Sequence, residues 1–517
     1  MRLKLHRLVL TSLAIGSAVL VYLTLFRGNA DLATTLSLSH LSSGLRGNGF
    51  LSLRPPLEAL NADVNATYLN AARRFWRPWA TIINNSKPTI SAIRVKGTGA
   101  SNIGVPTDSD GIRKEFPFLL DLSEADTKAM QSSHAIIKDA LDAASDKLKE
   151  DAGSLYQGRG IVTVAGGEYF GPAIVGIKML RQTGSKLPVE AFLANWEEYE
   201  PALCEKVLPN LNARCVVLSQ FLEPPKEDEI GDEAVNHQNL TFSITHYQLK
   251  SLALLFSSFQ DVLLLDSDSI PVVNPEELLA TKPFSSTGFI GWSDFWVGSE
   301  APVFYRIAGL DRFPKNMPVA SSEAGQLLVD KRMHIKTLIL ATYYNIWGPE
   351  YYYPLLSQGA LGQGDKNTFE TAAIVLGAPY YRVKTPVRSL GRHSGDEFKG
   401  SAMVQFHPRD DYEKYEGVTE VSAKPTVRAA FMHANTPKMN AGHLVDEGDL
   451  QDQESKKHLR LWGSLDDQQS IFGMDFEKST FQVVVDVGCE LAATVKEWKH
   501  RWMICSKLKS HFKATFE

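Results

Sequence analysis

Residues 262–275 read VLLLDSDSIPVVNP, in which an apolar run is followed at once by two carboxylates, Asp266 and Asp268. A short apolar run bounded by turn-forming residues predicts a buried β-strand. The strand should end at Asp266, with Asp268 on the turn that follows. This stretch is decisive because both acidic side chains then lie at the end of a strand whose neighbours can be predicted from the preceding sequence.

Strands and helices alternate before this stretch. We expect strands at residues 160–165, 189–193, 214–218 and 261–265, and helices at 123–150, 172–183, 197–207 and 242–256. Such alternation indicates βαβ units and a parallel sheet with helices on both faces, that is, an α/β domain. Residues 288–292 and 371–376 should extend the same domain. Ligands of such sheets bind beyond the carboxyl ends of the strands, where Asp266 and Asp268 lie.

Asp266 and Asp268 are two residues apart, so both carboxylates can reach one point just past the strand end. Two hard oxygen ligands suit Mg²⁺ or Mn²⁺, which bind through one or two carboxylates together with substrate phosphates. The alternative is an ordinary turn, in which aspartate is common. The residues alone leave both interpretations open.

An apolar segment at residues 8–26 contains no charged side chain and follows Arg2, Lys4 and Arg7. A helix of this length spans about 28 Å, close to the thickness of a bilayer core. We expect a single-pass type II anchor with residues 1–7 in the cytosol, a stem and lead-in segment at 27–120 and a lumenal catalytic domain at 121–517. A cleaved signal peptide is the alternative, although its apolar region is usually shorter.

Composition is consistent with a lumenal globular protein. The 517 residues are 44% hydrophobic and carry a net charge of −5, so the basic surplus of a nucleic-acid-binding protein is missing. Sequons begin at Asn65, Asn84 and Asn239, which fits glycosylation in the secretory pathway. Four cysteines allow three pairings. Proximity favours Cys204–Cys215 and Cys489–Cys505.

Four stretches resemble the fungal Golgi α-mannosyltransferases of the Mnn type, glycosyltransferase family 71. They are GIVTVAGG at 160–167, QLKSLALLFSSFQDVLLLDSD at 248–268, GQGDKNTFE at 362–370 and HANTPK at 433–438. The resemblance spans roughly residues 120–450. Two positions depart from the family pattern: Ser269 stands where asparagine is frequent, and Ala324 stands where serine is expected.

The resemblance implies a GT-A-like fold, a Rossmann-like mixed sheet with flanking helices that binds a nucleotide sugar. It further implies a retaining α-mannosyltransferase of the Golgi membrane, with GDP-mannose as donor and a mannose-terminated, mannan-type glycan as acceptor. Mn²⁺, or Mg²⁺, is the expected ion. Among the linkages, α-1,2 is favoured over α-1,3.

Several residues are expected to bind the donor. Gly166 and Gly167 follow a predicted strand and would let the backbone approach the nucleotide, although an ordinary turn has the same composition. By resemblance, Lys250 would neutralise the diphosphate near Asp266; a solvated helix lysine is the alternative. Lys438 would meet the β-phosphate of the departing GDP.

His433 follows an apolar run, AAFM at 429–432. By resemblance it would join Asp266 and Asp268 as the third metal ligand, because a neutral imidazole is an acceptable ligand beside carboxylates. The alternative is a hydrogen-bonded histidine at a strand end.

The sugars are expected to meet two further segments. The resemblance assigns Asp365, with its neighbour Lys366, to the donor mannose or the acceptor hydroxyls as catalytic residues; Asp365 could also be a helix N-cap. Trp292 and Asp294 suit an acceptor site, since aromatic faces stack on sugars and carboxylates bind hydroxyls. Core packing is the alternative for Trp292 and Trp296.

Three other functions compete with this one. A UDP-sugar could be the donor, since nothing in the residues separates guanine from uracil. A non-catalytic carbohydrate-binding protein could keep the fold, but the presence of Asp266, Asp268 and His433 argues against it. A hydrolase needs two carboxylates that face each other across the bond, some 5–9 Å apart, which two positions at one strand end serve poorly.

Overall fold

The computed structural model describes residues 66–517, except residues 110, 224–241, 243, 245, 316, 395, 418–425 and 453. The predicted tail, membrane anchor and stem up to residue 65 lie outside the described residues, as does the sequon at Asn239. Within the described part of the chain, no helix has both the length and the apolar character to cross a membrane. All elements named below belong to one compact unit, within residues Phe50–Leu240 and Tyr247–Glu517.

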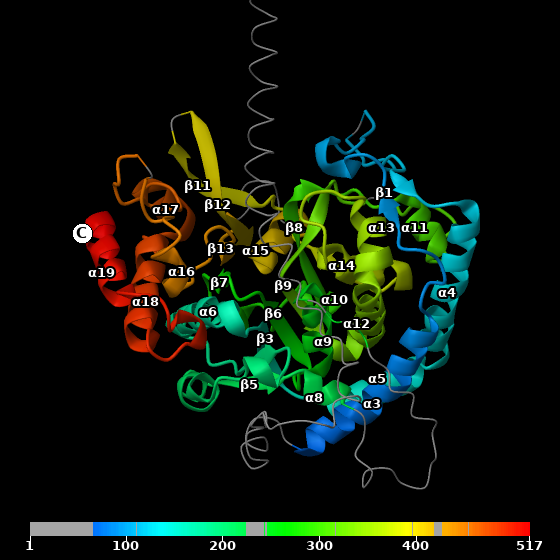
Figure 1. Cartoon of the computed structure of the whole chain (residues 1–517). Coiled ribbons are helices and arrows are strands. Elements are labelled where there is room, and N and C mark those ends of the chain that lie inside the picture. Colours follow the sequence, from blue (N-terminus) through cyan, green and yellow to red (C-terminus); the bar gives the residue numbers. More distant parts are fainter. Residues whose placement is uncertain are drawn as a thin grey trace, which may run out of the picture. The chain divides into compact units, whose positions relative to one another are not determined.

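The helices of this unit cover two sheets (Figure 1). Their bounds are α3 Ala66–Asn85, α4 Glu124–Ala143, α5 Ser145–Leu155, α6 Phe170–Gln182, α7 Leu208–Asn210, α8 Ser219–Leu222, α9 Leu249–Phe256, α10 Phe284–Thr287, α11 Pro302–Ile307, α12 Lys331–Ile346, α13 Tyr353–Ser357, α14 Lys366–Leu376, α15 Pro408–Tyr415, α16 Ala441–Leu444, α17 Leu465–Phe472, α18 Phe476–Leu491 and α19 Ile504–Phe516. Helix α3 contacts α4, α5 and α8, so the unit extends N-terminal to Asp121, where the expected catalytic domain begins.

The larger sheet has seven strands in the order β10-β8-β9-β6-β3-β4-β5. They are β3 Arg159–Val164, β4 Val189–Leu193, β5 Ala213–Val217, β6 Asp261–Leu265, β8 Phe289–Val297, β9 Ala320–Asp330 and β10 Tyr381–Arg382. Strands β6, β3, β4 and β5 are parallel, as the βαβ pattern predicts. Strand β9 runs antiparallel to both β6 and β8, so the sheet is mixed.

Both faces of this sheet are buried. Ile161 and Leu263 share a hydrophobic core with Ile174 of α6 and Val484 of α18. Successive side chains of a strand point to opposite faces, and the next positions along β3 and β6 are equally buried. Helix α9 contacts β3, and α14 contacts β9. Burial on both faces explains why the parallel strands read as continuous apolar runs.

A second, antiparallel sheet has the order β11-β12-β13-β7. Its strands are β7 Ser269–Pro271, β11 Arg388–Ser394, β12 Glu397–Phe406 and β13 Ala429–His433. A two-stranded sheet pairs β1 Arg94–Val95 with β2 Leu120–Asp121. Only three residues, 266–268, lie between the end of β6 and the start of β7, so the segment of Asp266 and Asp268 connects the two sheets.

The predicted elements are mostly confirmed, with three corrections. The helix expected at 123–150 is divided at Ala144 into α4 and α5. The helix expected at 197–207 is instead a 3-10 turn at Trp196–Glu198 and a π-helix at Leu203–Val207, because Pro201 disfavours helical backbone just before it. Of the helix expected at 242–256, residues 243 and 245 lie outside the described residues, and the rest includes a 3-10 turn at His246–Gln248 followed by α9, Leu249–Phe256. Both expected disulfides, Cys204–Cys215 and Cys489–Cys505, are present.

The C-terminal helices are held to the domain by Trp498. This side chain is fully buried, and its indole N–H donates to Asn440 at 2.9 Å. A Cβ at Gly442 would lie 2.4 Å from the indole, and a Cβ at Gly171 of α6 would lie 2.6 Å from it. Both glycines therefore leave the space that the ring fills.

We predict that Trp498→Ala lowers the free energy of unfolding by about 3–5 kcal/mol, because a large buried side chain is lost and a cavity remains. Urea unfolding followed by circular dichroism measures the change. The matched control is Trp502→Ala, since Trp502 is 81% exposed; it should shift stability by no more than about 0.5 kcal/mol. Equal effects of the two substitutions would contradict the packing described here.

Candidate metal centre and active site

The two aspartates lie on the connection between the sheets. The backbone N–H of Asp266 donates to the carbonyl of Gly325 at 2.8 Å, which continues the pairing of β6 with β9 by one residue. The carbonyl of Asp266 accepts the N–H of Ser269 at 2.9 Å and closes the turn. Asp268 is 3% exposed. The predicted strand end and turn are confirmed, and both carboxylates lie at the carboxyl end of β6.

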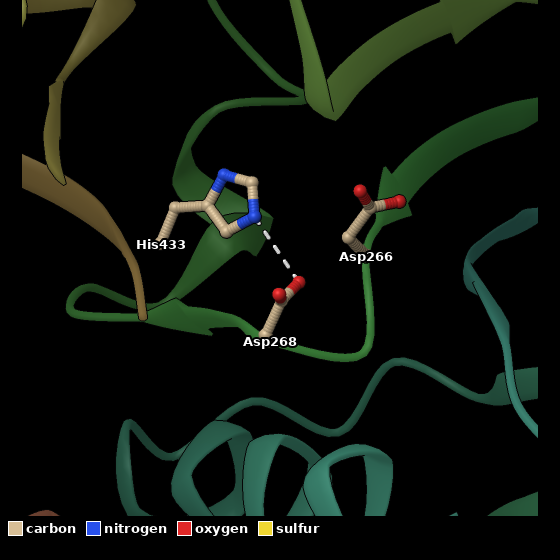
Figure 2. A group of neighbouring side chains, drawn as sticks. All are labelled: Asp266, Asp268 and His433. Atoms are coloured by element: carbon tan, nitrogen blue, oxygen red, sulfur yellow. Dashed lines mark hydrogen bonds and ion pairs between the residues drawn. The ribbon is translucent and has the colours of Figure 1, made fainter. Parts of the chain in front are cut away.

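His433 is brought to this turn by the second sheet. Strand β13 pairs with β7 so that His433 is opposite Ser269. Its Nε2 lies 3.1 Å from Oδ1 of Asp268, and the N–H of Ala434 donates to the Asp268 carbonyl at 2.9 Å. Figure 2 shows His433 on its own strand facing Asp268, with Asp266 beside them on the same turn as Asp268.

The donor set of this cluster fits a divalent cation. One oxygen from each aspartate and one imidazole nitrogen all lie within 4.8 Å of one another. Carboxylate oxygens suit Mg²⁺ and Mn²⁺, and an imidazole nitrogen is accepted by Mn²⁺. Two carboxylates and one neutral imidazole leave coordination positions for further oxygen ligands.

Without an ion, protein cations balance the buried charge of Asp268. Lys438 forms an ion pair with its second oxygen. Burial raises the pKa of Asp268, but Lys438 and His433 outweigh it and hold that pKa below the usual range. Burial likewise opposes a charged imidazole, yet Asp268 raises the pKa of His433 to about 9. Lys438 also lies 5.8 Å from the centre of the Tyr169 ring.

Lys250 of α9 links Asp266 to Asp365. Its Nζ donates to Asp266 at 2.7 Å and lies 3.5 Å from Oδ2 of Asp365. Although burial disfavours the ammonium, the two carboxylates raise the pKa of Lys250 above its usual range. The alternative of a solvated helix lysine is therefore wrong.

Asp365 and Lys366 have separate surroundings. Asp365 is 3% exposed, makes no side-chain capping bond to α14, and its Oδ2 accepts no hydrogen bond among the described residues. Asp365 thus occupies the N-cap position of α14, as expected, but its side chain does not cap the helix. Burial raises the pKa of Asp365 to about 6, against the opposing effect of Lys250. Lys366 instead donates from Nζ to Asp294 at 2.6 Å.

Glu323 of β9 is a buried acid at this site that the sequence did not single out. Its Oε1 lies 3.8 Å from Nδ1 of His433 and accepts the N–H groups of Ala324 and Gly325 at 2.9 and 2.6 Å. Burial, and then the charge of Asp294, raise the pKa of Glu323. Its signal in the sequence was a single charged residue in the otherwise uncharged stretch between Lys315 and Asp330.

An irregularity of β9 makes room for His433. Four residues of β9, 324–327, oppose the single residue Gly291 of β8. A Cβ at Gly325 would lie 2.7 Å from Nδ1 of His433. Glycine at this position therefore allows the imidazole to reach Asp268.

The two predicted donor glycines differ. Both have positive φ, 104° at Gly166 and 50° at Gly167, which favours glycine. A Cβ at Gly166 would lie 2.4 Å from the Glu198 carboxylate, whereas a Cβ at Gly167 would meet nothing within 4 Å. Gly167 therefore has the open space that a nucleotide would need to approach the backbone, whereas the space next to Gly166 is filled by Glu198.

The expected acceptor residues are both buried. Trp292 is fully buried, its N–H donates to the Phe406 carbonyl at 2.8 Å, and its ring packs edge-on against Phe431. The prediction that Trp292 stacks on a sugar is therefore wrong, because no ring face is accessible, and the core-packing alternative holds. Asp294 is 5% exposed and accepts from Lys366 and from the N–H of Phe295. These contacts make Asp294 part of an internal ion pair.

We predict that Asp266→Asn, Asp268→Asn and His433→Gln each weaken Mn²⁺ binding to the full-length protein about tenfold or more, because each removes a ligand. Calorimetric titration with MnCl₂ measures the affinity. The matched control is Asp261→Asn at the other end of β6, where the carboxylate pairs with Arg159 at 3.0 Å. Wild-type affinity in all three cluster variants would show that the cluster does not bind the metal.

Comparison with known proteins identifies related enzymes. A family model described as "Mannosyltransferase putative" matches residues 158–318 and 310–407. "Alpha-1,2-mannosyltransferase MNN21" of Candida albicans is 33% identical over 501 residues, covering 84% of this chain and 73% of that protein. "Alpha-1,2-mannosyltransferase MNN2" of Saccharomyces cerevisiae is 34% identical over 444 residues, covering 73% and 71%.

Among solved structures, an active-site mutant of LgtC is similar with a TM-score of 0.28 and 16% identity, over 43% of this chain and 72% of that one. A score of this size supports no conclusion about this chain. The identities and coverage of the two mannosyltransferases confirm the resemblance inferred from the sequence motifs, and the chain therefore belongs to the Mnn-type mannosyltransferase family.

Proposed function

We propose that this mannosyltransferase is an α-1,2-mannosyltransferase that transfers mannose from GDP-mannose to mannose-terminated, mannan-type glycans of glycoproteins in the Golgi, with retention of configuration. The observation that carries the proposal is the cluster of Asp266, Asp268 and His433 at the carboxyl end of β6. The linkage is taken from the printed names of the relatives. GDP-mannose as the donor and retention of the α configuration are inferred from the family resemblance.

The cluster suits a nucleotide-sugar diphosphate within a GT-A-like fold. Asp266, Asp268 and His433 would hold Mn²⁺ or Mg²⁺, which offsets the negative charge that develops on the diphosphate when the glycosidic bond breaks. The side chain of Lys438 is 41% exposed. Its ammonium can therefore turn from Asp268 toward the β-phosphate and stabilise the leaving GDP. Gly167 gives the donor unobstructed backbone next to this site.

Asp365 is the proposed catalytic carboxylate at the donor mannose. Its buried Oδ2 lies 3.5 Å from Nζ of Lys250 but accepts no hydrogen bond among the described residues. This oxygen can accept a sugar hydroxyl or face the positive charge that develops at the anomeric carbon. Lys250 forms ion pairs with both Asp365 and Asp266. It therefore connects the carboxylate proposed for the donor mannose with a proposed metal ligand. Lys366 is the first residue of α14, and its Nζ donates to Asp294. It is the second residue that we propose to be catalytic. The departing phosphate can take the acceptor proton, so the mechanism requires no separate base.

We predict transfer from GDP-mannose to α-mannobiose in the presence of Mn²⁺. EDTA should abolish it and added Mn²⁺ restore it, because the diphosphate charge needs a counter-ion. GDP should inhibit far better than UDP, and linkage analysis of the product should give α-1,2-mannose. Asp268→Asn should lose transfer, whereas Asp261→Asn should keep it.

The possible failures of this experiment are distinct. Stronger inhibition by UDP than by GDP would indicate that the donor is a UDP-sugar. Full activity in EDTA would show that transfer does not require a bound divalent cation. Binding of mannosides without turnover of any donor would favour a non-catalytic carbohydrate-binding protein.

We predict a type II topology with residues 8–26 as the anchor, because basic residues precede the apolar segment. Protease added to intact microsomes should leave everything after Phe26 protected, and detergent should remove the protection. Asn84→Gln should abolish one glycosidase-sensitive mass shift. A digested C-terminus, or a mature chain that starts after residue 26, would contradict the anchor.

A further inference from the structure

We propose that Trp296 forms an acceptor subsite, in which its indole stacks on a mannose ring of the acceptor glycan. The subsite rests on the proposed function, since it assigns the residue that holds the acceptor. It replaces Trp292, whose ring is fully buried. Trp296 is 40% exposed, and it lies on the same strand only four residues further on.

A bulge in β8 places Trp296 outside the regular pairing of the sheet. In the pairing of β8 with β9, Ser293 is opposite Ser322 and Val297 is opposite Ala320. Three residues of β8 therefore oppose one residue of β9. Bulges of this kind redirect side chains and are frequent next to active sites. Both aromatic residues of the bulge, Phe295 and Trp296, are exposed, at 43% and 40%.

The bulge is fixed from within by Asp294. Its Oδ1 accepts the N–H of Phe295 at 2.6 Å, and its Oδ2 accepts Nζ of Lys366 at 2.6 Å. The same carboxylate thus shapes the bulge and joins it to the start of α14. Because Asp294 is almost fully buried, Trp296 is displayed from a rigid support rather than from a loose loop.

A glycine-rich loop supports the indole. A Cβ at Gly362 would lie 3.0 Å from Cδ1 of Trp296 and 2.6 Å from Nζ of Lys366. A Cβ at Gly364 would lie 3.6 Å from the ring of Tyr247, which is 50% exposed. The loop at residues 362–364 therefore has an exposed aromatic ring at each end, and Asp365 follows it directly.

The contacts connect this aromatic surface to the reacting centre. Lys366 touches the bulge, and its neighbour Asp365 is 3.5 Å from Lys250, which in turn binds Asp266. Trp296 thus contacts the loop that leads directly into Asp365, the carboxylate proposed for the donor mannose. Aromatic faces suit the apolar C–H face of a pyranose, and they leave the hydroxyls free for polar partners. A neutral glycan needs no charged group to bind there.

The test compares Trp296→Ala with Trp296→Phe in the full-length protein, using GDP-mannose and α-mannobiose. Trp296→Ala should raise the KM for α-mannobiose about tenfold, with kcat and the KM for GDP-mannose within about twofold, as expected when an interaction is made equally in ground and transition states. Trp296→Phe keeps a ring face and should recover most of the loss. The control Trp502→Ala removes an indole that is 81% exposed, two residues before α19, and should behave as wild type.

Calorimetric binding of α-mannobiose in the presence of GDP and Mn²⁺ tests the subsite without turnover. Loss of binding in Trp296→Ala, with binding retained in Trp502→Ala, supports the subsite even if the donor assignment fails. Unchanged acceptor affinity in Trp296→Ala, or no binding by the wild type, would overturn the subsite. A raised donor KM with an unchanged acceptor KM would also overturn it and would move Trp296 to the donor side.

Discussion

The buried carboxylate of Asp268 is the constraint on which the rest of the site depends. Asp268 is only 3% exposed, so its negative charge must be paired, because an unpaired ion in the protein interior is very unfavourable. Its pairing with His433 requires β13 to lie beside β7, and this register forms the second sheet. Asp268 is therefore a candidate metal ligand and also the residue at which the two sheets are joined.

The same requirement explains the irregular parts of β9. A regular strand would place a side chain where the imidazole of His433 lies, and Gly325 removes it. The backbone N–H groups released from regular pairing at residues 324 and 325 are satisfied by Glu323. Glu323 thereby places a buried carboxylate next to Nδ1 of His433, while Nε2 of the same ring contacts Asp268. The departures from ideal sheet geometry in β8 and β9 thus lie next to the proposed chemistry and shape it.

The charged groups of the site form three local sets of opposite charges. Lys438 and His433 neutralise Asp268, Lys250 lies between Asp266 and Asp365, and Asp294 holds Lys366. Alternating signs keep each buried charge next to an opposite one, which lets several ionised groups share a site of low solvent access. In the proposed function, donor and acceptor enter a site whose charges are already arranged, so little reorganisation is needed during the reaction.

The sequence by itself determined the parallel strands, the position of Asp266 and Asp268 at a strand end and the family, because local apolar patterns and short motifs encode each of them. Proximity along the chain favoured the two disulfides that the structure contains. Only the tertiary structure decided which aromatic residue is accessible. Trp292 and Trp296 occur four residues apart in one strand; Trp292 is buried, whereas Trp296 lies in a bulge in the pairing of β8 with β9 and is exposed. Glu323 and the environment of Lys250 also depend on contacts between segments far apart in the chain. Such contacts follow from register and packing, which no local pattern specifies.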